Sequence, residues 1–191
     1  MDKPYPDMEV MLEQRLFGCV MHQTFTALFV FEWILNLYCI EHILETGTAR
    51  GGLSLFLQQQ AAVRDIGYNT YDAIDRRKDS CNYAVETKAV NNLALLNPHY
   101  KKLDVFAEET VAEIRAIMET KRVLFYCDNG NKPREVKTYA PFLRPGAVIG
   151  THDWNNQFEI EDLVRDLSLK VIFEEFCKTY KTKQRFWVKT A

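Results

Sequence analysis

The sequence has little of what marks disulfide-rich, zinc-binding or nucleic-acid-binding chains. Its five cysteines lie far apart and form no Cys-x-x-Cys pair, which fits a reducing, cytoplasmic location. Its 24 Lys and Arg residues are balanced by 26 Asp and Glu residues. Because no basic excess is left to neutralise phosphates, we expect no nucleic-acid partner.

Export signals, membrane spans, repeats and linkers are missing too. Residues 1–6 hold two prolines and no apolar run, unlike a secretory signal. The apolar stretch 24–44 has spanning length, but four polar residues interrupt it: Glu32, Asn36, Glu41 and His42. We therefore expect no membrane partner and one domain over residues 1–191, with residues 1–41 as a helical segment packed on it.

What is present is an alternation of helical and strand patterns. The spacing of Phe25, Phe29, Trp33 and Leu37 predicts a buried helix over 25–40. Apolar runs predict strands at 42–45, 67–72, 100–106, 123–128 and 147–151. Helical periodicity predicts helices at 53–63, 80–96, 108–119, 134–143 and 159–167. Two last strands, 170–176 and 184–189, are joined by a polar stretch and read as a hairpin. The expected fold is a Rossmann-like, doubly wound α/β fold, with a mostly parallel sheet and a terminal antiparallel β-hairpin.

The most informative segment is the Gly-rich turn Glu-Thr-Gly-Thr-Ala-Arg-Gly-Gly-Leu-Ser at 45–54, between the first predicted parallel strand and a helix. Gly47 allows a tight turn, and Gly51 and Gly52 let a ligand and the helix approach the backbone closely. The helix N-terminus adds free N–H groups, so a polar or anionic ligand is expected. The alternative is an ordinary strand-to-helix loop.

These residues resemble the first motif of class I S-adenosylmethionine-dependent methyltransferases. Glu45, Gly47 and Gly51 occupy three motif positions, and Ala49 replaces the middle glycine. The resemblance implies that Glu45 helps to hold the turn and the polar tail of the cofactor. It also implies that Asp72, with Asp75 as the fallback, accepts hydrogen bonds from both ribose hydroxyls. The implied cofactor site comprises Glu45, Gly47, Thr48, Gly51, Asp72, Asp104 beside the adenine, and Asp128.

A narrower resemblance, to cephalosporin-hydroxylase-like and sugar O-methyltransferases, rests on Asp-Asn-Gly-Asn at 128–131, Leu-Arg-Pro-Gly-Ala-Val-Ile at 143–149 and His152-Asp153. In that subgroup an acid after one strand and an acidic pair after the next hold a divalent cation, which positions the acceptor hydroxyl. Two positions depart from the subgroup: Asn131 stands in place of a histidine, and His152 replaces an acid.

The residues alone support a similar site. Asp128 and Asp153 follow adjacent predicted strands at the edge where open α/β sheets bind ligands. With His152 or Asn129 as an extra ligand they form a candidate Mg²⁺ or Mn²⁺ site, and the alternative is a pair of solvated loop acids. His152 and Asp128 are the candidate catalytic residues, with His152 as general base. Lys132 and Arg134 near Asp128 either steer an anionic acceptor or lie in a solvated helix start.

We therefore expect an S-adenosylmethionine-dependent methyltransferase acting on a hydroxyl of a small molecule or sugar. One alternative is a non-catalytic methyltransferase-like binding or scaffold protein. Another is an NAD(P)-dependent oxidoreductase, because Gly47-x-Ala49-x-x-Gly52 approximates the dinucleotide fingerprint. Trp154 and Phe158 either line the acceptor pocket or meet a second subunit. The apolar helix over 25–40 is a candidate homodimer contact.

Overall fold

The fold is built on one seven-stranded sheet in a computed structural model that describes residues 15–16, 19–72, 99–153 and 161–191. The strands are β3 (His42–Thr46), β4 (Gly67–Asp72), β5 (Tyr100–Lys102), β6 (Val123–Cys127), β7 (Val148–Thr151), β8 (Leu169–Ile172) and β9 (Arg185–Lys189). Their spatial order is β5-β4-β3-β6-β7-β9-β8. The first five are parallel, and β9 is antiparallel to both β7 and β8. Two short strands, β1 (Arg15–Leu16) and β2 (Cys19–Val20), pair separately.

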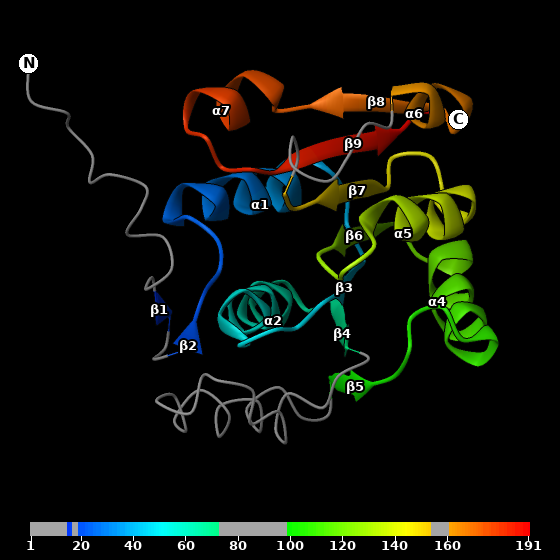
Figure 1. Ribbon diagram of the computed structural model, residues 1–191, viewed down its shortest axis with the longest axis horizontal. Coiled ribbons are helices and arrows are strands. Elements are labelled where there is room, and N and C mark those ends of the chain that lie inside the picture. Colours follow the sequence, from blue (N-terminus) through cyan, green and yellow to red (C-terminus); the bar gives the residue numbers. More distant parts are fainter. Residues whose placement is uncertain (1–14, 17–18, 73–98, 154–160) are drawn as a thin grey trace, which may run out of the picture.

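Helices cover both faces of this sheet (Figure 1). On one face lie α1 (Phe25–Leu37) and α2 (Gly52–Arg64), and on the other lie α4 (Glu108–Thr120) and α5 (Lys132–Tyr139). The shorter helices are the 3-10 turn η4 (Ala140–Phe142), α6 (Glu161–Asp166) and α7 (Glu174–Thr179). The expected Rossmann-like, doubly wound α/β fold is confirmed.

The central strand β6 shows why the sheet is stable between two helical layers. All five of its residues are buried, which is typical of a parallel strand covered on both faces. Leu124 and Tyr126 pack into the apolar cluster beneath α1 and α2, whereas Val123 and Phe125 pack into the cluster beneath α4 and α5. The alternation of strand side chains therefore divides the core into two layers.

The C-terminal region corrects the predicted hairpin. The antiparallel pairing of β8 with β9 is confirmed, but the connection is not a simple polar turn. It contains the helix α7, so the strand predicted over 170–176 ends at Ile172. Phe173 has a positive φ of 56° and forms the N-cap of α7, which turns the chain away from the sheet.

The prediction that α1 is buried holds for one face of the helix only. The buried residues include Ala27, Val30, Phe31, Ile34 and Leu35. The predicted stripe is instead exposed, by 48% at Phe25, 57% at Phe29, 36% at Trp33 and 69% at Leu37. Both faces of this helix are apolar, so the period of its apolar residues did not identify the inner face.

Other element boundaries also differ from prediction. The strand expected over 100–106 ends at Lys102, and the helix expected over 134–143 begins at Lys132 and passes into η4 after Tyr139. The helix predicted at 80–96 lies outside the described residues, as do Asp75, Trp154 and Phe158. Of the helices in the described ranges, none combines the length and apolar character needed to cross a bilayer.

Candidate functional site

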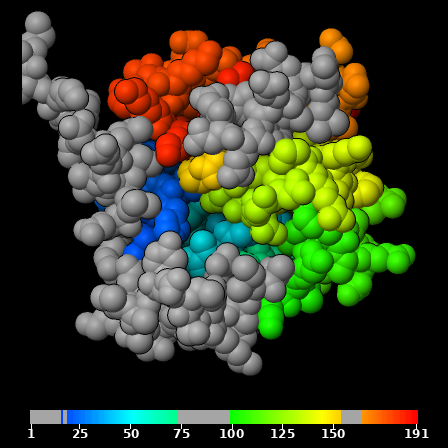
Figure 2. Space-filling model, viewed as in Figure 1, coloured from blue at the N-terminus to red at the C-terminus, as the bar shows by residue number. Residues whose placement is uncertain are grey.

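The candidate site lies where the strand order reverses. Strand β3 is followed by α2 and pairs next with β4, whereas β6 and β7 extend the sheet on the other side of β3. Ligands of open α/β sheets bind at the carboxyl ends of the strands beside such a switch point. In Figure 2 the turn at the start of α2 (cyan), α5 (lime) and the end of β7 (yellow to orange) lie near one another on the viewed face.

Gly47 makes the turn that follows β3. Its φ is 90°, a left-handed conformation that favours glycine, and its N–H donates to the carbonyl of Tyr71 at 2.8 Å. A Cβ at this position would lie 2.4 Å from the carbonyl oxygen of Asp128. The turn therefore packs directly against the segment that follows β6, as expected for a tight turn.

The remainder of the turn leads into α2 through two further left-handed residues. Ala49 has a φ of 46°, and Gly51 has a φ of 79° as the N-cap of α2. No side chain caps the first turn of this helix. The hydroxyls of Thr48 and Thr70 lie 2.6 Å apart and fix the turn to β4. The replacement of the motif's middle glycine by Ala49 therefore preserves a glycine-like conformation.

Asp72, at the end of β4, lies beside this turn. Its side chain is buried, and its Oδ2 accepts a hydrogen bond from the backbone N–H of Ala49 at 3.3 Å. Asp104 follows the next strand of the sheet, because Asp72 pairs with Lys102. Asp104 is exposed, and its carboxylate accepts from the N–H of Phe106 at 2.9 Å. The structure thus brings Asp72 to the turn and Asp104 to the same sheet edge.

Glu45 points into the protein rather than into the turn. It is 1% exposed, and its Oε2 accepts a hydrogen bond from the hydroxyl of Tyr68 at 2.8 Å. Burial raises the pKa of Glu45 to about 7. This contact joins β3 to β4 next to the turn, and the expected role of Glu45 in holding the turn and the polar tail of the cofactor stays a prediction.

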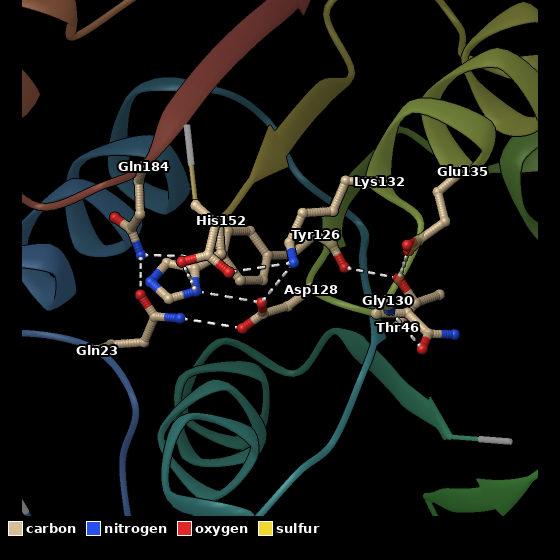
Figure 3. Close-up of polar contacts among 11 residues, drawn as sticks. Gln23, Thr46, Tyr126, Asp128, Gly130, Lys132, Glu135, His152 and Gln184 are labelled. Carbon is tan, nitrogen blue, oxygen red and sulfur yellow. Dashed lines mark hydrogen bonds and ion pairs between the residues drawn. The ribbon is translucent and has the colours of Figure 1, made fainter. Parts of the chain in front are cut away.

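Asp128 is the centre of a second polar cluster (Figure 3). Its Oδ2 accepts from Nε2 of Gln23 at 3.0 Å. Its Oδ1 lies 3.2 Å from Nδ1 of His152 and 3.7 Å from Nζ of Lys132. The loops after β6 and β7 and the segment before α1 therefore meet at one carboxylate.

Asp153 extends this cluster. One of its oxygens lies 3.5 Å from Nδ1 of His152 and the other lies 3.3 Å from Nζ of Lys132. One ligand atom from each of Asp128, His152 and Asp153 lies within 4.8 Å of the others. Two carboxylates and an imidazole suit Mg²⁺ or Mn²⁺ in ligand type. These three residues form a group that could hold a metal ion.

The structure corrects the expectation that Lys132 lies in a solvated helix start. The residue is 4% exposed, although it is the first residue of α5, and its ammonium group faces both carboxylates. A lysine this buried is rare unless it is paired.

Sequence reasoning missed two buried glutamines beside Asp128. Nε2 of Gln184 donates to Oε1 of Gln23 at 2.9 Å and lies 3.1 Å from the hydroxyl of Tyr126. The two glutamines are only 1% and 2% exposed. Isolated amides carry no spacing signal.

A third missed residue is Glu135 of α5, which is fully buried. Its carboxylate accepts a hydrogen bond from the hydroxyl of Thr46, the last residue of β3. Burial raises the pKa of Glu135 to about 7. Glu135 thus ties α5 to the strand that precedes the Gly-rich turn.

Three buried polar atoms near the end of β7 have no hydrogen-bond partner among the described residues: Oγ1 of Thr151, Nε2 of His152 and Oε1 of Gln184. Buried polar atoms are normally hydrogen-bonded. Such atoms are consistent with a region that binds a polar ligand.

Comparisons with known proteins identify the fold. The sequence matches no family model and no curated protein sequence. A structure of CmcI with SAH aligns over 100% of this chain and 88% of its own, with 13% identity and a TM-score of 0.63. A CmcI structure with Mg-SAM aligns over 100% and 81%, with 15% identity and a TM-score of 0.63.

A third solved structure is the MycE methyltransferase from the mycinamycin biosynthetic pathway, in complex with Mg and SAH. It aligns over 85% of this chain and 46% of its own, with 13% identity and a TM-score of 0.52. At these identities the likeness establishes a shared fold. The chain therefore shares the Rossmann-like α/β fold of CmcI and MycE.

Proposed function

We propose that this protein is an S-adenosylmethionine-dependent methyltransferase that methylates a hydroxyl of a small molecule, with sugars among the acceptors. The observation that carries the proposal is the buried Asp72 carboxylate against the Gly-rich turn at the switch point of the sheet. A carboxylate only accepts hydrogen bonds, which suits the two hydroxyls of a ribose. The class I methyltransferase fold supports the same assignment.

The hydrogen bonding of Ala49 weighs against the oxidoreductase alternative. A dinucleotide needs backbone N–H groups of the turn to receive its pyrophosphate. The N–H of Ala49 instead donates to Asp72, so this donor is already engaged. The uncharged adenosine part of S-adenosylmethionine does not require this backbone donor.

The proposed cofactor site uses the residues at the ends of β3, β4 and β5. Asp72 binds the ribose, and Asp104 lies beside the adenine. Gly47, Thr48 and Gly51 shape the turn, while Glu45 holds it from beneath and Asp128 faces the polar tail. The hydrogen bonds of Thr48 to Thr70 and of Glu45 to Tyr68 support these positioning roles.

His152 and Asp128 are the proposed catalytic residues. The cofactor supplies an electrophilic methyl group, and an acceptor oxygen attacks it most readily once its proton is accepted by a base. Nδ1 of His152 faces Asp128 at 3.2 Å, whereas its Nε2 has no partner among the described residues. We assign Nε2 as the proton acceptor, with the Asp128 carboxylate stabilising the imidazolium that results.

The metal assignment concerns Asp128, His152 and Asp153. Their ligand atoms are close enough to share one ion, and their chemistry fits Mg²⁺ or Mn²⁺. A bound cation would lower the pKa of the acceptor hydroxyl. Because the cation would occupy a ring nitrogen of His152, this role of His152 is an alternative to its role as general base.

The test is calorimetric titration with S-adenosylhomocysteine, with NADH and NADPH titrated alongside. We expect saturable binding of S-adenosylhomocysteine alone. Preference for a nicotinamide cofactor would refute the proposal, and binding of neither would favour the scaffold alternative. Incubation with S-adenosylmethionine and a panel of sugars and other hydroxyl compounds, followed by mass spectrometry, then tests for O-methylation.

We also propose a homodimer that buries the exposed stripe of α1. The support is the exposure of Phe25, Phe29 and Leu37 along one side of this helix. We expect sedimentation analysis to find a dimer that Phe29→Glu converts to monomer. Lys137→Glu, at an exposed position on the opposite face of the sheet, serves as the control. A monomeric wild-type protein would contradict this assignment.

We further propose that residues 1–191 form one domain in which the N-terminal segment is integral. The support is that α1 residues share a core cluster with β3 and β6. A Cβ on Gly52 of α2 would also lie 2.5 Å from the carbonyl oxygen of Val20. A single cooperative unfolding transition is expected, and two separate transitions would contradict it.

A cytoplasmic location is supported by the cysteines. Among the described residues, Cys39, Cys127 and Cys177 are free thiols. Unpaired cysteines suit a reducing compartment. Localisation of the tagged protein in cell fractions tests this assignment, and recovery outside the cytoplasm would refute it.

A further inference from the structure

Lys132 is placed unusually for a charged residue at a helix start. It is 4% exposed and lies immediately after the loop that carries Asp128. Burial costs a lysine both hydration and side-chain freedom, so a specific partner must offset that cost. The described partners of its ammonium group are the carboxylates of Asp128 and Asp153.

These two carboxylates also belong to the group that could hold a metal ion. The Lys132 nitrogen lies 3.7 Å from Oδ1 of Asp128 and 3.3 Å from Oδ2 of Asp153. Figure 3 shows the ammonium group reaching into the cluster between β6 and β7, close to His152. The lysine therefore neutralises part of the negative charge that would attract a cation.

A divalent cation and this ammonium group repel each other strongly at such short range, because the site is largely shielded from water. Lysine has a long, flexible side chain, so it can leave the cluster without unfolding α5. Leaving, however, gives up both ion pairs. The free energy of metal binding must therefore offset both the loss of the two Lys132 ion pairs and the loss of water from the hydrated ion.

We propose that the Lys132 ammonium group is the resident cation of the Asp128–Asp153 pair, and that a divalent cation binds there only by displacing it. This inference rests on the proposed function, because Asp128 and Asp153 belong to the metal site proposed for the methyl acceptor. It assigns Lys132 as the residue that sets how readily the site takes a metal.

The experiment measures Mn²⁺ binding to the cofactor-free protein by calorimetry and electron paramagnetic resonance. Lys132→Met keeps the length of the side chain and removes its charge. We expect it to bind Mn²⁺ at least about tenfold more tightly than wild type. Lys137→Met removes a lysine from an exposed position of the same helix, so its Mn²⁺ affinity should equal that of wild type.

Adding Asp153→Asn to Lys132→Met should remove the gain, which would locate the ion at this pair. Equal or weaker Mn²⁺ binding by Lys132→Met, or a gain that survives Asp153→Asn, would overturn the proposal. If the methionine variant does not fold, Lys132→Gln provides the same comparison and keeps a hydrogen-bond donor. Titration of each folded variant with S-adenosylhomocysteine separates this result from failure of the proposed function, because Mn²⁺ binding needs no cofactor.

Discussion

The substitution Asp72→Asn tests the proposed cofactor site without changing its shape. Asparagine keeps one oxygen in place for the N–H of Ala49, so the turn retains its described hydrogen bond. The substitution removes the negative charge and replaces an acceptor with a donor. A bound ribose would therefore lose charge-assisted hydrogen bonds, while the space available to it would stay the same.

A hydrogen bond to a charged group contributes about 1.5–3 kcal/mol, so the dissociation constant for S-adenosylhomocysteine should rise roughly 10- to 150-fold. The melting temperature should change little, because Asp72 keeps its size and its backbone partner. Calorimetric titration gives the affinity, and thermal unfolding monitored by circular dichroism gives the stability.

Asp65→Asn is the matched control. Asp65 is exposed at the end of α2 with a φ of 53°, a left-handed conformation that asparagine also tolerates. The Asp65→Asn variant should bind S-adenosylhomocysteine with the affinity of the wild-type protein. Unchanged affinity in Asp72→Asn would refute the assignment of Asp72 to the ribose. Lost affinity together with a large fall in melting temperature would show that Asp72 acts on the fold instead.

Two further predictions concern stability. Gly47→Ala should destabilise the protein by at least about 2 kcal/mol, because its φ is 90° and its Cβ would meet the Asp128 carbonyl at 2.4 Å. Gly130→Ala, whose Cβ would meet nothing within 4 Å, should cost far less in urea unfolding, and equal losses would contradict the close approach. Burial raises the pKa of Glu135 to about 7 from the usual 4.5, so the folded state binds the proton of this carboxyl group more tightly than the unfolded state does. Wild type should therefore lose up to about 3 kcal/mol of stability through this group as pH rises from 4.5 through 7. Glu135→Gln should remove that loss in urea unfolding at pH 5 and pH 8, and parallel pH profiles would contradict the assignment.

Much of the fold was predictable because parallel strands carry a strong local signal. The run at 123–127 is buried on both faces, so every residue is apolar or aromatic and the strand is evident without its neighbours. The helix α7 was missed because six residues between two strands give too little periodicity to recognise. The exposure of one side of α1 was not predictable, because apolar residues lie on both sides of this helix. Contacts with α2, and with β6 and β9 far away in the sequence, select the face that carries Phe31.

The site was partly predictable for a similar reason. Asp72, Asp128 and Asp153 each follow a recognisable strand, and parallel strands bring their carboxyl ends to one edge. The burial of Lys132 was not predictable, because it depends on two carboxylates, one in the loop after β6 and one in the loop after β7. Gln23 and Gln184 were not predictable either, since neither belongs to a motif and each acquires its role from the other.

The hydrogen bond between Gln23 and Gln184 joins residues 161 positions apart. Closing so long a loop costs more entropy than closing the short loops between neighbouring elements. Gln23 also donates to the Asp128 carboxylate, so the segment before α1, the loop after β6 and the residue before β9 form one chain of hydrogen bonds. A truncation that removes β9 and Gln184 would therefore disturb the polar cluster at Asp128, although it leaves every described side-chain partner of that carboxylate in place.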